Sequence, residues 1–243
     1  MEKGEYNVHP RVTTIGFDAD DTLWHNERYF TLTQDRFAAL LADHAAPEGL
    51  MDRLLEAERR NLPHYGFGIK GFTLSMIETA IEVTDGAVTA DVIAEILQAG
   101  RQMLSHDVEL LPHVTRTLEQ LGERHRLILI TKGDLLDQQR KLAESELRGY
   151  FDAVEIVSDK NSGIYSEIFA RCGDGPERGL MVGDSMRSDV LPMIAAGGHG
   201  VHVPHGTPWA IERAEPPHGE ARYHEIADLA ALPALVHRLC AES

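Results

Sequence analysis

Two carboxylates that directly follow an apolar run restrict the fold of this chain more than any other feature. Residues 12–17 are Val-Thr-Thr-Ile-Gly-Phe, and Asp18-Ala-Asp20 follows at once. Residues two positions apart on an extended backbone point to the same face, so we expect Asp18 and Asp20 to share one small volume at the carboxyl end of a strand. In an open α/β sheet, ligands bind at that edge. Like charges there need a cation or a shared proton, so the pattern predicts a metal site, an acid–base pair, or both.

The charge and composition of the chain narrow the classes of partner. The 243 residues carry a formal net charge of -16, which argues against a nucleic-acid polymer or an anionic membrane surface and favours a small-molecule ligand. No apolar run approaches the length of a membrane span, and the first five residues lack the apolar segment of a signal peptide. We therefore expect a cytoplasmic protein, and the sequence leaves open whether it is a monomer or a homodimer.

The spacing of the apolar residues divides the chain into a helical block and an α/β block. Between residues 23 and 107 the helical spacing predicts four amphipathic helices, with breakers at 47–49, 63–71 and 85–86. After about residue 110 the pattern predicts strands at 127–130, 153–157, 179–182 and 200–203, and helices at 112–121, 134–146, 162–172, 187–196 and 226–239. Residues 204–219, rich in Pro, His and Gly, are expected to form an irregular loop that Trp209 anchors against the core.

Strands that alternate with helices predict right-handed βαβ units and a Rossmann-like parallel sheet. The helical block interrupts this alternation just after the first strand. We therefore expect an α/β fold with two domains. Residues 1–22 and 108–243 would form the Rossmann-like core, and residues 23–107 would form an inserted four-helix bundle.

Reactive side chains follow four of the expected strands. They are the Asp18 and Asp20 pair, Thr131, Lys160 and Asp184. The carboxyl ends of parallel strands meet at one edge of a sheet, so we expect these residues to surround one site. Each of these residues alone is weak evidence for a functional site. Their combination is specific, because every one of them comes just after a predicted buried strand.

This combination of motifs resembles the haloacid dehalogenase superfamily, in its phosphatase branch. The resemblance covers nearly the whole chain and rests on FDADDTL at 17–23, ITKGD at 130–134, Lys160, and VGDSMRSD at 182–189. The helical block corresponds to the helical cap of that family. The resemblance implies a Mg²⁺-dependent phosphomonoester hydrolase that acts on a small phosphorylated metabolite through an aspartyl-phosphate intermediate.

The resemblance also implies a role for each acidic residue that matches the family motifs. Asp18 would be the nucleophile and, together with Asp184, a side-chain ligand of Mg²⁺. Asp20 would give its backbone carbonyl to the metal and serve as general acid and then as general base. Magnesium prefers oxygen ligands, and these motifs supply oxygens rather than thiols or imidazoles.

The remaining matching residues would bind the phosphoryl group. Thr131 and the backbone of the following turn, at Lys132 and Gly133, would hold the phosphoryl oxygens. Lys160 would neutralise the nucleophile and the transferring group. Asp189 would support Lys160 or the waters of the metal.

A glycine-rich segment in the helical block matches GxGxxG but does not predict a nucleotide site. Residues 66–71 follow no strand and lie in no βαβ unit, so we expect an inter-helical loop there. Such a loop can still face the active site. His64, Tyr65 and Lys70 are therefore the residues of the block that we expect to contact the substrate.

Three functions compete with the phosphatase on this fold. A 2-haloacid dehalogenase would use the same Asp18 attack without a metal, but that branch, like the phosphonate-cleaving enzymes, typically lacks Asp at the position of Asp20. A phosphomutase would need a cap that keeps water off the aspartyl-phosphate. A non-catalytic module that senses phosphate or binds a partner would not need Asp18, Asp20, Lys160 and Asp184 together. The natural substrate and the role of residues 204–219 stay open.

Overall fold

The computed structural model describes residues 12–241, so the expectation about a signal peptide falls on residues outside the described part. Helices and strands follow one another as β1 (Thr14–Phe17), α1 (Glu27–Leu40), α2 (Pro47–Tyr65), α3 (Ile69–Val83), α4 (Ala90–Met103), α5 (Val114–Gly122), β2 (Arg126–Lys132), α6 (Leu135–Glu144), β3 (Ala153–Val157), α7 (Ser162–Cys172), β4 (Gly179–Gly183), α8 (Leu191–Ala195), β5 (His199–His202), β6 (Tyr223–Glu225) and α9 (Leu232–Ala241). Within these residues no helix combines the length and the apolar character needed to cross a bilayer.

The strands form one parallel sheet of six, in the order β3-β2-β1-β4-β5-β6. Strand β1 pairs with β2 on one side and with β4 on the other, so the strand that leads into Asp18 lies in the middle of the sheet. The carboxyl ends of β1, β2 and β4 therefore lie side by side. The α/β fold with a Rossmann-like parallel sheet is confirmed.

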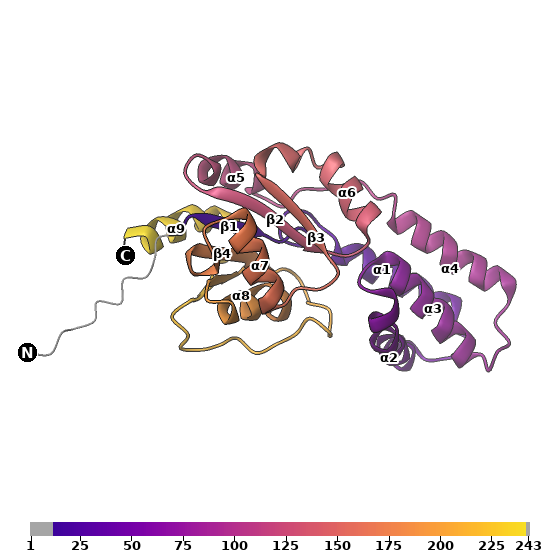
Figure 1. Cartoon of the computed structure of the whole chain (residues 1–243). Helices are drawn as coiled ribbons and strands as arrows, with labels where there is room; N and C mark the ends of the chain where they lie inside the picture. Colours follow the sequence, from indigo (N-terminus) through magenta and orange to yellow (C-terminus); the bar gives the residue numbers. More distant parts are fainter. Residues whose placement is uncertain (1–11, 242–243) are drawn as a thin grey trace, which may run out of the picture.

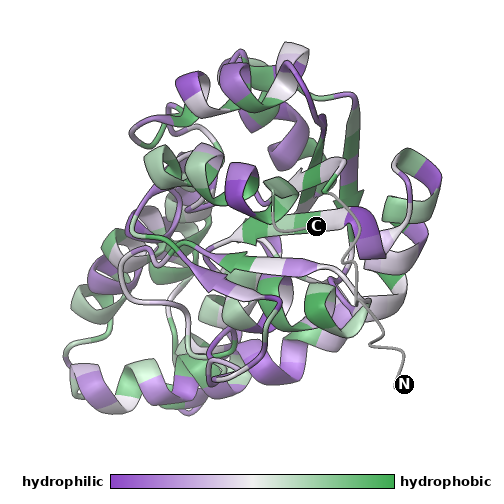
Figure 2. Ribbon diagram, turned by 90° about the vertical axis from the view of Figure 1, so that its left-hand side faces the viewer, coloured by the Kyte–Doolittle hydropathy of each residue, from purple (hydrophilic) through white to green (hydrophobic). Residues whose placement is uncertain are grey.

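Helices cover both faces of the sheet (Figure 1). Side chains of β2 alternate between two apolar clusters: Leu127 and Leu129 belong to one, and Ile128 and Ile130 to the other. Helices α5, α6 and α9 contribute side chains to the first cluster, and α7 and α8 contribute side chains to the second. Figure 2 shows the largely hydrophobic strands in the middle of the molecule with helices of mixed character around them. This three-layer packing fixes the positions of the strand ends.

Helices α1 to α4 form a separate group, called the helical unit below, beside the carboxyl edge of the sheet (Figure 1). They pack around an apolar cluster of their own. Phe37, Leu54, Met76 and Ile96, one from each helix, are at most 1% exposed in that cluster. The four helices expected between residues 23 and 107 are therefore present.

The chain enters and leaves the helical unit through two adjacent segments, 23–25 and 109–111. The N–H of Leu111 donates to the carbonyl of Leu23 at 2.9 Å, and the N–H of His25 donates to Glu109 at 3.0 Å. An antiparallel bridge lies between these two hydrogen bonds. We call this pair of segments the connector.

Some of the expected boundaries in the helical unit are wrong. Pro47 was expected to break a helix but opens α2, where its missing N–H and fixed φ are tolerated in the first turn. Helix α2 continues through Pro63 to Tyr65, and α3 already contains Gly71. The break between these helices is therefore much shorter than the expected 63–71, because packing of the α2 face outweighs the local preference of proline.

The C-terminal region also differs from the expectation. The helix expected at 226–239 begins only at Leu232, and the short edge strand β6 precedes it. Three residues are too few to display a period of two, so the pattern did not reveal this strand. The helix expected at 187–196 is divided into a π-helical turn, Met186–Val190, and α8.

Candidate active site

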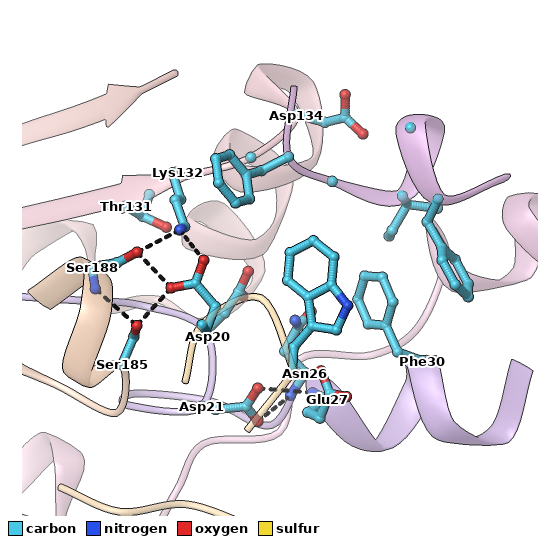
Figure 3. Close-up of a pocket in the computed structure, with 18 of the residues that line it drawn as sticks. Asp20, Asp21, Asn26, Glu27, Phe30, Thr131, Lys132, Asp134, Ser185 and Ser188 are labelled. Atoms are coloured by element: carbon cyan, nitrogen blue, oxygen red, sulfur yellow. Dashed lines mark hydrogen bonds and ion pairs between the residues drawn. The ribbon is translucent and has the colours of Figure 1, made fainter. Parts of the chain in front are cut away.

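A cavity lies between the carboxyl edge of the sheet and the helical unit (Figure 3). Segments from four different strand ends and from the helical unit contribute to its wall. Its lining includes every core residue proposed from the sequence, namely Asp18, Asp20, Thr131, Lys132, Gly133, Lys160, Asp184 and Asp189. Residues that are up to 171 positions apart in the sequence, from Asp18 to Asp189, thus surround one volume.

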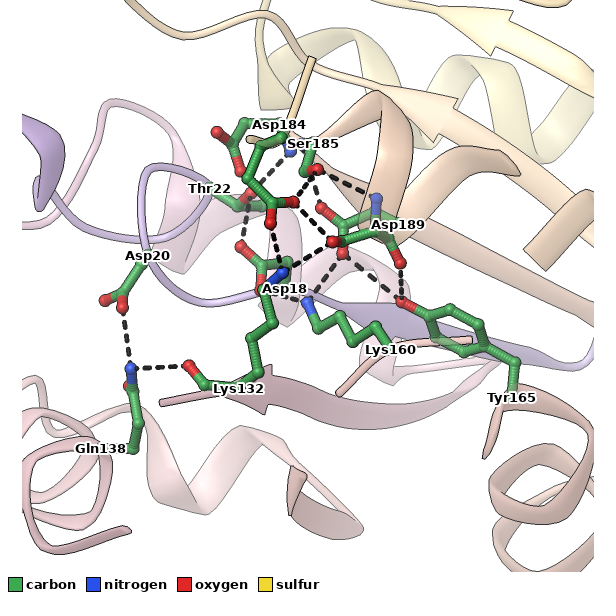
Figure 4. A network of polar contacts seen from close by, with 12 residues as sticks. Asp18, Asp20, Thr22, Lys132, Gln138, Lys160, Tyr165, Asp184, Ser185 and Asp189 are labelled. Carbon is green, nitrogen blue, oxygen red and sulfur yellow. Dashed lines mark hydrogen bonds and ion pairs between the residues drawn. The ribbon is translucent and has the colours of Figure 1, made fainter. Parts of the chain in front are cut away.

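Lys160 joins two buried carboxylates at the centre of this site (Figure 4). Its Nζ donates to Asp18 and, at 2.7 Å, to Asp189. Burial alone would lower the pKa of Lys160, but the charges of Asp18 and Asp189 raise it well above its ordinary value. Lys160 is therefore a cation held between two anions.

Three carboxylates share this one cation. Oxygens of Asp18, Asp184 and Asp189 all lie within 4.8 Å of one another. Burial raises the pKa of Asp18 and of Asp184, even though Lys160 acts in the opposite direction. The side chain of Asp184 has no hydrogen-bond or ion-pair partner within residues 12–241. A set of carboxylate oxygens with surplus negative charge fits Mg²⁺, which binds hard oxygen ligands.

Both oxygens of Asp189 are engaged, as are both oxygens of Asp18, which accept from Lys160 and from the hydroxyl of Thr22. One oxygen of Asp189 accepts the Lys160 ammonium, and the other accepts the N–H of Ser185 at 3.0 Å. Gly183 packs so closely against Asp189 that a Cβ there would overlap the carboxylate. These contacts fix Asp189 beside Lys160, whereas the side chain of Asp184 has no such contact within residues 12–241.

Asp20 lines the same cavity but is turned towards α6 (Figure 4). Its carboxylate accepts the Nε2 of Gln138 at 2.7 Å, the Nε1 of Trp24 at 2.7 Å and the ammonium of Lys141 at 3.0 Å. Asp18 instead accepts from Lys160 and from the hydroxyl of Thr22. The two carboxylates therefore line one cavity, and their hydrogen-bond partners differ.

The backbone explains why Asp18 and Asp20 diverge. Strand β1 ends one residue before Asp18, and Asp21 adopts a left-handed φ of 59°. Both carboxylates therefore lie beyond the paired part of the strand, and the chain turns just after Asp20. Asp21 instead accepts the N–H groups of Asn26 and Glu27, at 2.9 and 2.8 Å, and so satisfies the first turn of α1.

The residues expected to bind the phosphoryl group lie at the end of β2. Thr131 is 2% exposed, and its hydroxyl has no hydrogen-bond partner within residues 12–241. Gly133 has a φ of 137°, a conformation that favours glycine. The ammonium of Lys132 contacts Ser188 at 2.7 Å and Glu212 at 2.6 Å, so its charge is already paired.

Five residues of the loop 204–219 line the cavity although no sequence pattern revealed them there, and Glu212 and Trp209 are the two that make the contacts described next. Glu212 accepts hydrogen bonds from Lys132, Ser185 and Ser188. Burial would raise the pKa of Glu212, but Lys132 and these hydrogen bonds lower it below its ordinary value. Trp209 was expected to anchor the loop to the core, and it reaches the helical unit instead, where its Nε1 donates to Glu58 at 3.1 Å.

The residues of the helical unit that we expect to contact the substrate lie outside the cavity wall. His64, Tyr65 and Lys70 are exposed and are not among the described residues that line the cavity. His64 and Tyr65 end α2, and Lys70 lies in the first turn of α3, where its ammonium pairs with Asp134 at 3.1 Å. The neighbouring residues Phe67, Gly68, Ile69 and Gly71 line the cavity in their place.

Comparisons with known proteins point to one family. The family model described as haloacid dehalogenase-like hydrolase matches residues 12–197. The chain is 27% identical to glyceraldehyde 3-phosphate phosphatase of Methanothermobacter thermautotrophicus over 198 residues, which are 76% of this chain and 83% of the relative. It is 32% identical to N-acylneuraminate-9-phosphatase of Mus musculus over 129 residues, which are 49% of this chain and 51% of that enzyme.

A solved structure extends the likeness to the whole described fold. The haloacid dehalogenase-like family hydrolase from Xanthomonas campestris superposes with a TM-score of 0.85 at 38% sequence identity. The match covers 95% of this chain and 93% of that one. The likeness therefore includes both the sheet and the helical unit.

Proposed function

The chain belongs to the haloacid dehalogenase-like hydrolases, and from this premise we propose that it is a Mg²⁺-dependent phosphatase of a small phosphorylated metabolite. The observation that carries the proposal is the convergence of Asp18, Lys160, Asp184 and Asp189 at the carboxyl edge of one sheet. Two curated relatives that are named as phosphatases support it. The hydrolysis would proceed through an aspartyl-phosphate on Asp18.

We further propose that residues 23–107 act as a cap domain over a core formed by residues 1–22 and 108–243. The helical unit has an apolar cluster of its own and joins the rest of the chain through the connector. Phe30 and Phe72 of this unit line the cavity opposite the strand ends. Closure of such a unit would exclude water and select the substrate.

Asp18 is the proposed nucleophile. Its carboxylate attacks phosphorus, and the Asp18–phosphorus bond forms as the bond to the leaving oxygen breaks. When Mg²⁺ is bound by Asp18 and Asp184, it supplies Lewis-acid chemistry that offsets the repulsion between carboxylate and phosphate. Lys160 holds Asp18 in place and contributes positive charge, while the hydroxyl of Thr131 is available to donate to a phosphoryl oxygen.

Asp20 is the proposed acid and base. As an acid it protonates the leaving oxygen, and as a base it then takes a proton from the water that cleaves the aspartyl-phosphate. Lys141, Gln138 and Trp24 donate to its carboxylate and fix its position at the cavity wall.

A dehalogenase is the nearest alternative. It would use Asp18 in the same attack but would need neither a leaving-group acid nor a metal. The donors around Asp20 and the carboxylate pair of Asp18 and Asp184 favour the phosphatase.

The experiment measures release of p-nitrophenol from p-nitrophenyl phosphate, with Mg²⁺ and with a chelator, for the wild type and two variants. We expect turnover that depends on Mg²⁺ and a loss of at least about 10³-fold in Asp18→Asn. The exposed Asp91→Asn, a change of the same kind in the first turn of α4, should retain full activity. Turnover that survives the chelator or Asp18→Asn contradicts the proposal, halide release from 2-chloropropionate supports a dehalogenase, and a folded protein without turnover supports a binding module.

A further inference from the structure

The part of the cavity that faces away from Asp18 has a distinct composition, and we call it the distal end. Glu27 and Phe30 lie on this side of the cavity, apart from Thr131 and Lys132 (Figure 3). We define the distal end by Glu27, Phe30, Glu58, Phe72 and Trp209, all of which line the cavity. The indole of Trp209 donates to Glu58, the charge of Glu58 acts on Glu27, and the ring centroids of Phe30 and Phe72 lie 5.0 Å apart. The distal end thus combines two carboxyl side chains with three aromatic side chains.

Neither carboxylate of the distal end has a cationic partner. No hydrogen bond or ion pair reaches the side chain of Glu27 from residues 12–241. Glu58 is 8% exposed and accepts one hydrogen bond, from the neutral indole of Trp209 at 3.1 Å. Burial and the charges of Asp21 and Glu58 raise the pKa of Glu27 to about 8, and burial raises the pKa of Glu58 to about 7. A bound positive charge would stabilise the ionised forms of Glu27 and Glu58, and a bound negative charge would destabilise them further.

The cations of the cavity are already neutralised. Of the described residues that line it, the lysines are Lys132, Lys141 and Lys160, and arginine is absent. Each lysine pairs with carboxylates of the protein, in the combinations Lys132–Glu212, Lys141–Asp20, Lys141–Asp137, Lys160–Asp18 and Lys160–Asp189. A second acidic group on a substrate would therefore find no unpaired lysine or arginine among these described lining residues, and the imidazole of His205 lies 3.6 Å from Asp21. It would instead meet buried carboxyl groups in a medium of low dielectric constant.

We infer that the distal end selects substrates by the charge of the leaving group, with Glu27 and Glu58 as the residues that determine specificity. The substrate class is a phosphomonoester without a second acidic group, and a leaving group with a primary ammonium is preferred over one with a hydroxyl. Carboxylates together with aromatic faces are the surroundings in which proteins bind ammonium groups. This inference rests on the proposed phosphatase function.

The test compares alkyl phosphates that differ only in the far end of the chain, which carries an ammonium, a hydroxyl or a carboxylate. Chains of two to five carbons are screened, and the length with the highest kcat/KM for the hydroxyl compound is used. We expect kcat/KM to fall in the order ammonium, hydroxyl, carboxylate, with at least about tenfold between the first and the last. In Glu27→Gln and in Glu58→Gln this ratio should shrink at least about threefold, because each variant removes a carboxyl group that can ionise beside a bound ammonium.

Glu56→Gln is the matched control, since it makes the same change on an exposed face of α2. It should leave the ratio as it is in the wild type. Turnover of p-nitrophenyl phosphate reports on the folding of each variant and on the phosphatase function itself. If that turnover is absent, the proposed function fails. If it is present but the carboxylate compound is hydrolysed as well as the ammonium compound, or neither variant changes the ratio, the charge selection alone is refuted.

Discussion

Lys160→Met removes the cation between two buried carboxylates while keeping most of the side-chain volume. The side chains of Lys160 and Asp189 are each 1% exposed, and that of Asp18 is 9% exposed. Removing one partner of a buried ion pair costs about 3–5 kcal/mol, because the remaining charges stay buried without compensation. For a chain of this size each kcal/mol lowers Tm by about 2–4 °C, so we expect a fall of about 6–20 °C.

The assay is thermal unfolding in a chelating buffer, with Lys70→Met as the control. Lys70 also pairs with an aspartate, Asp134, but its side chain is 56% exposed. An exposed pair contributes at most about 1 kcal/mol, so the control should lose no more than about 4 °C. Adding Asp189→Asn to Lys160→Met should recover part of the loss, since one uncompensated charge is then removed.

The loss of stability in Lys160→Met should depend on pH in a definite direction. Burial raises the pKa of Asp18 in the folded protein, and loss of Lys160 raises it further. The folded variant then binds protons more readily than the unfolded chain, so its stability rises as the pH falls. The deficit relative to the wild type should therefore be larger at pH 8 than at pH 5. A deficit no larger than that of Lys70→Met, or one that grows at low pH, would refute the reasoning about the buried bridge.

Two further predictions concern stability and the support of the site. Glu27 has a folded pKa of about 8 against an ordinary value of 4.5, so wild-type stability should fall as the pH rises through that interval, and Glu27→Gln should flatten the fall in denaturant titrations at several pH values. An equal slope in both proteins would contradict the burial of this group. Gly183→Ala should displace Asp189, cost about 1–3 kcal/mol and reduce phosphatase turnover, whereas Gly149→Ala, where nothing lies within 4 Å, should do neither. Full turnover in Gly183→Ala would show that the tight packing against Asp189 is dispensable.

Local sequence was sufficient to predict the part of the site that the sheet builds. An apolar strand followed directly by Asp18, Thr131 or Asp184 identifies a carboxyl strand end, and a parallel sheet brings such ends to one edge. The positions of Gln138 and Lys141 at the site could also have been predicted from the sequence. They are three residues apart on the helix that follows β2, so they share a face that can reach the same edge.

The residues that the sequence did not reveal reach the site through long loops. Glu212 meets Lys132 across 80 positions, and Trp209 meets Glu58 across 151 positions. No periodicity exists in an irregular loop, so nothing local indicates which of its side chains turns inward. The end of α2 was hard to predict for a related reason, because it depends on packing between helices rather than on Pro63.

The connector has a consequence for how proteins built on this plan can diversify. Because the chain departs and returns at neighbouring positions, a replacement insert of any length needs only two ends that lie equally close together. Exchanging the insert would leave the pairing of β1 with β2 and β4 intact. The reaction and the substrate specificity of such proteins can therefore change independently in evolution.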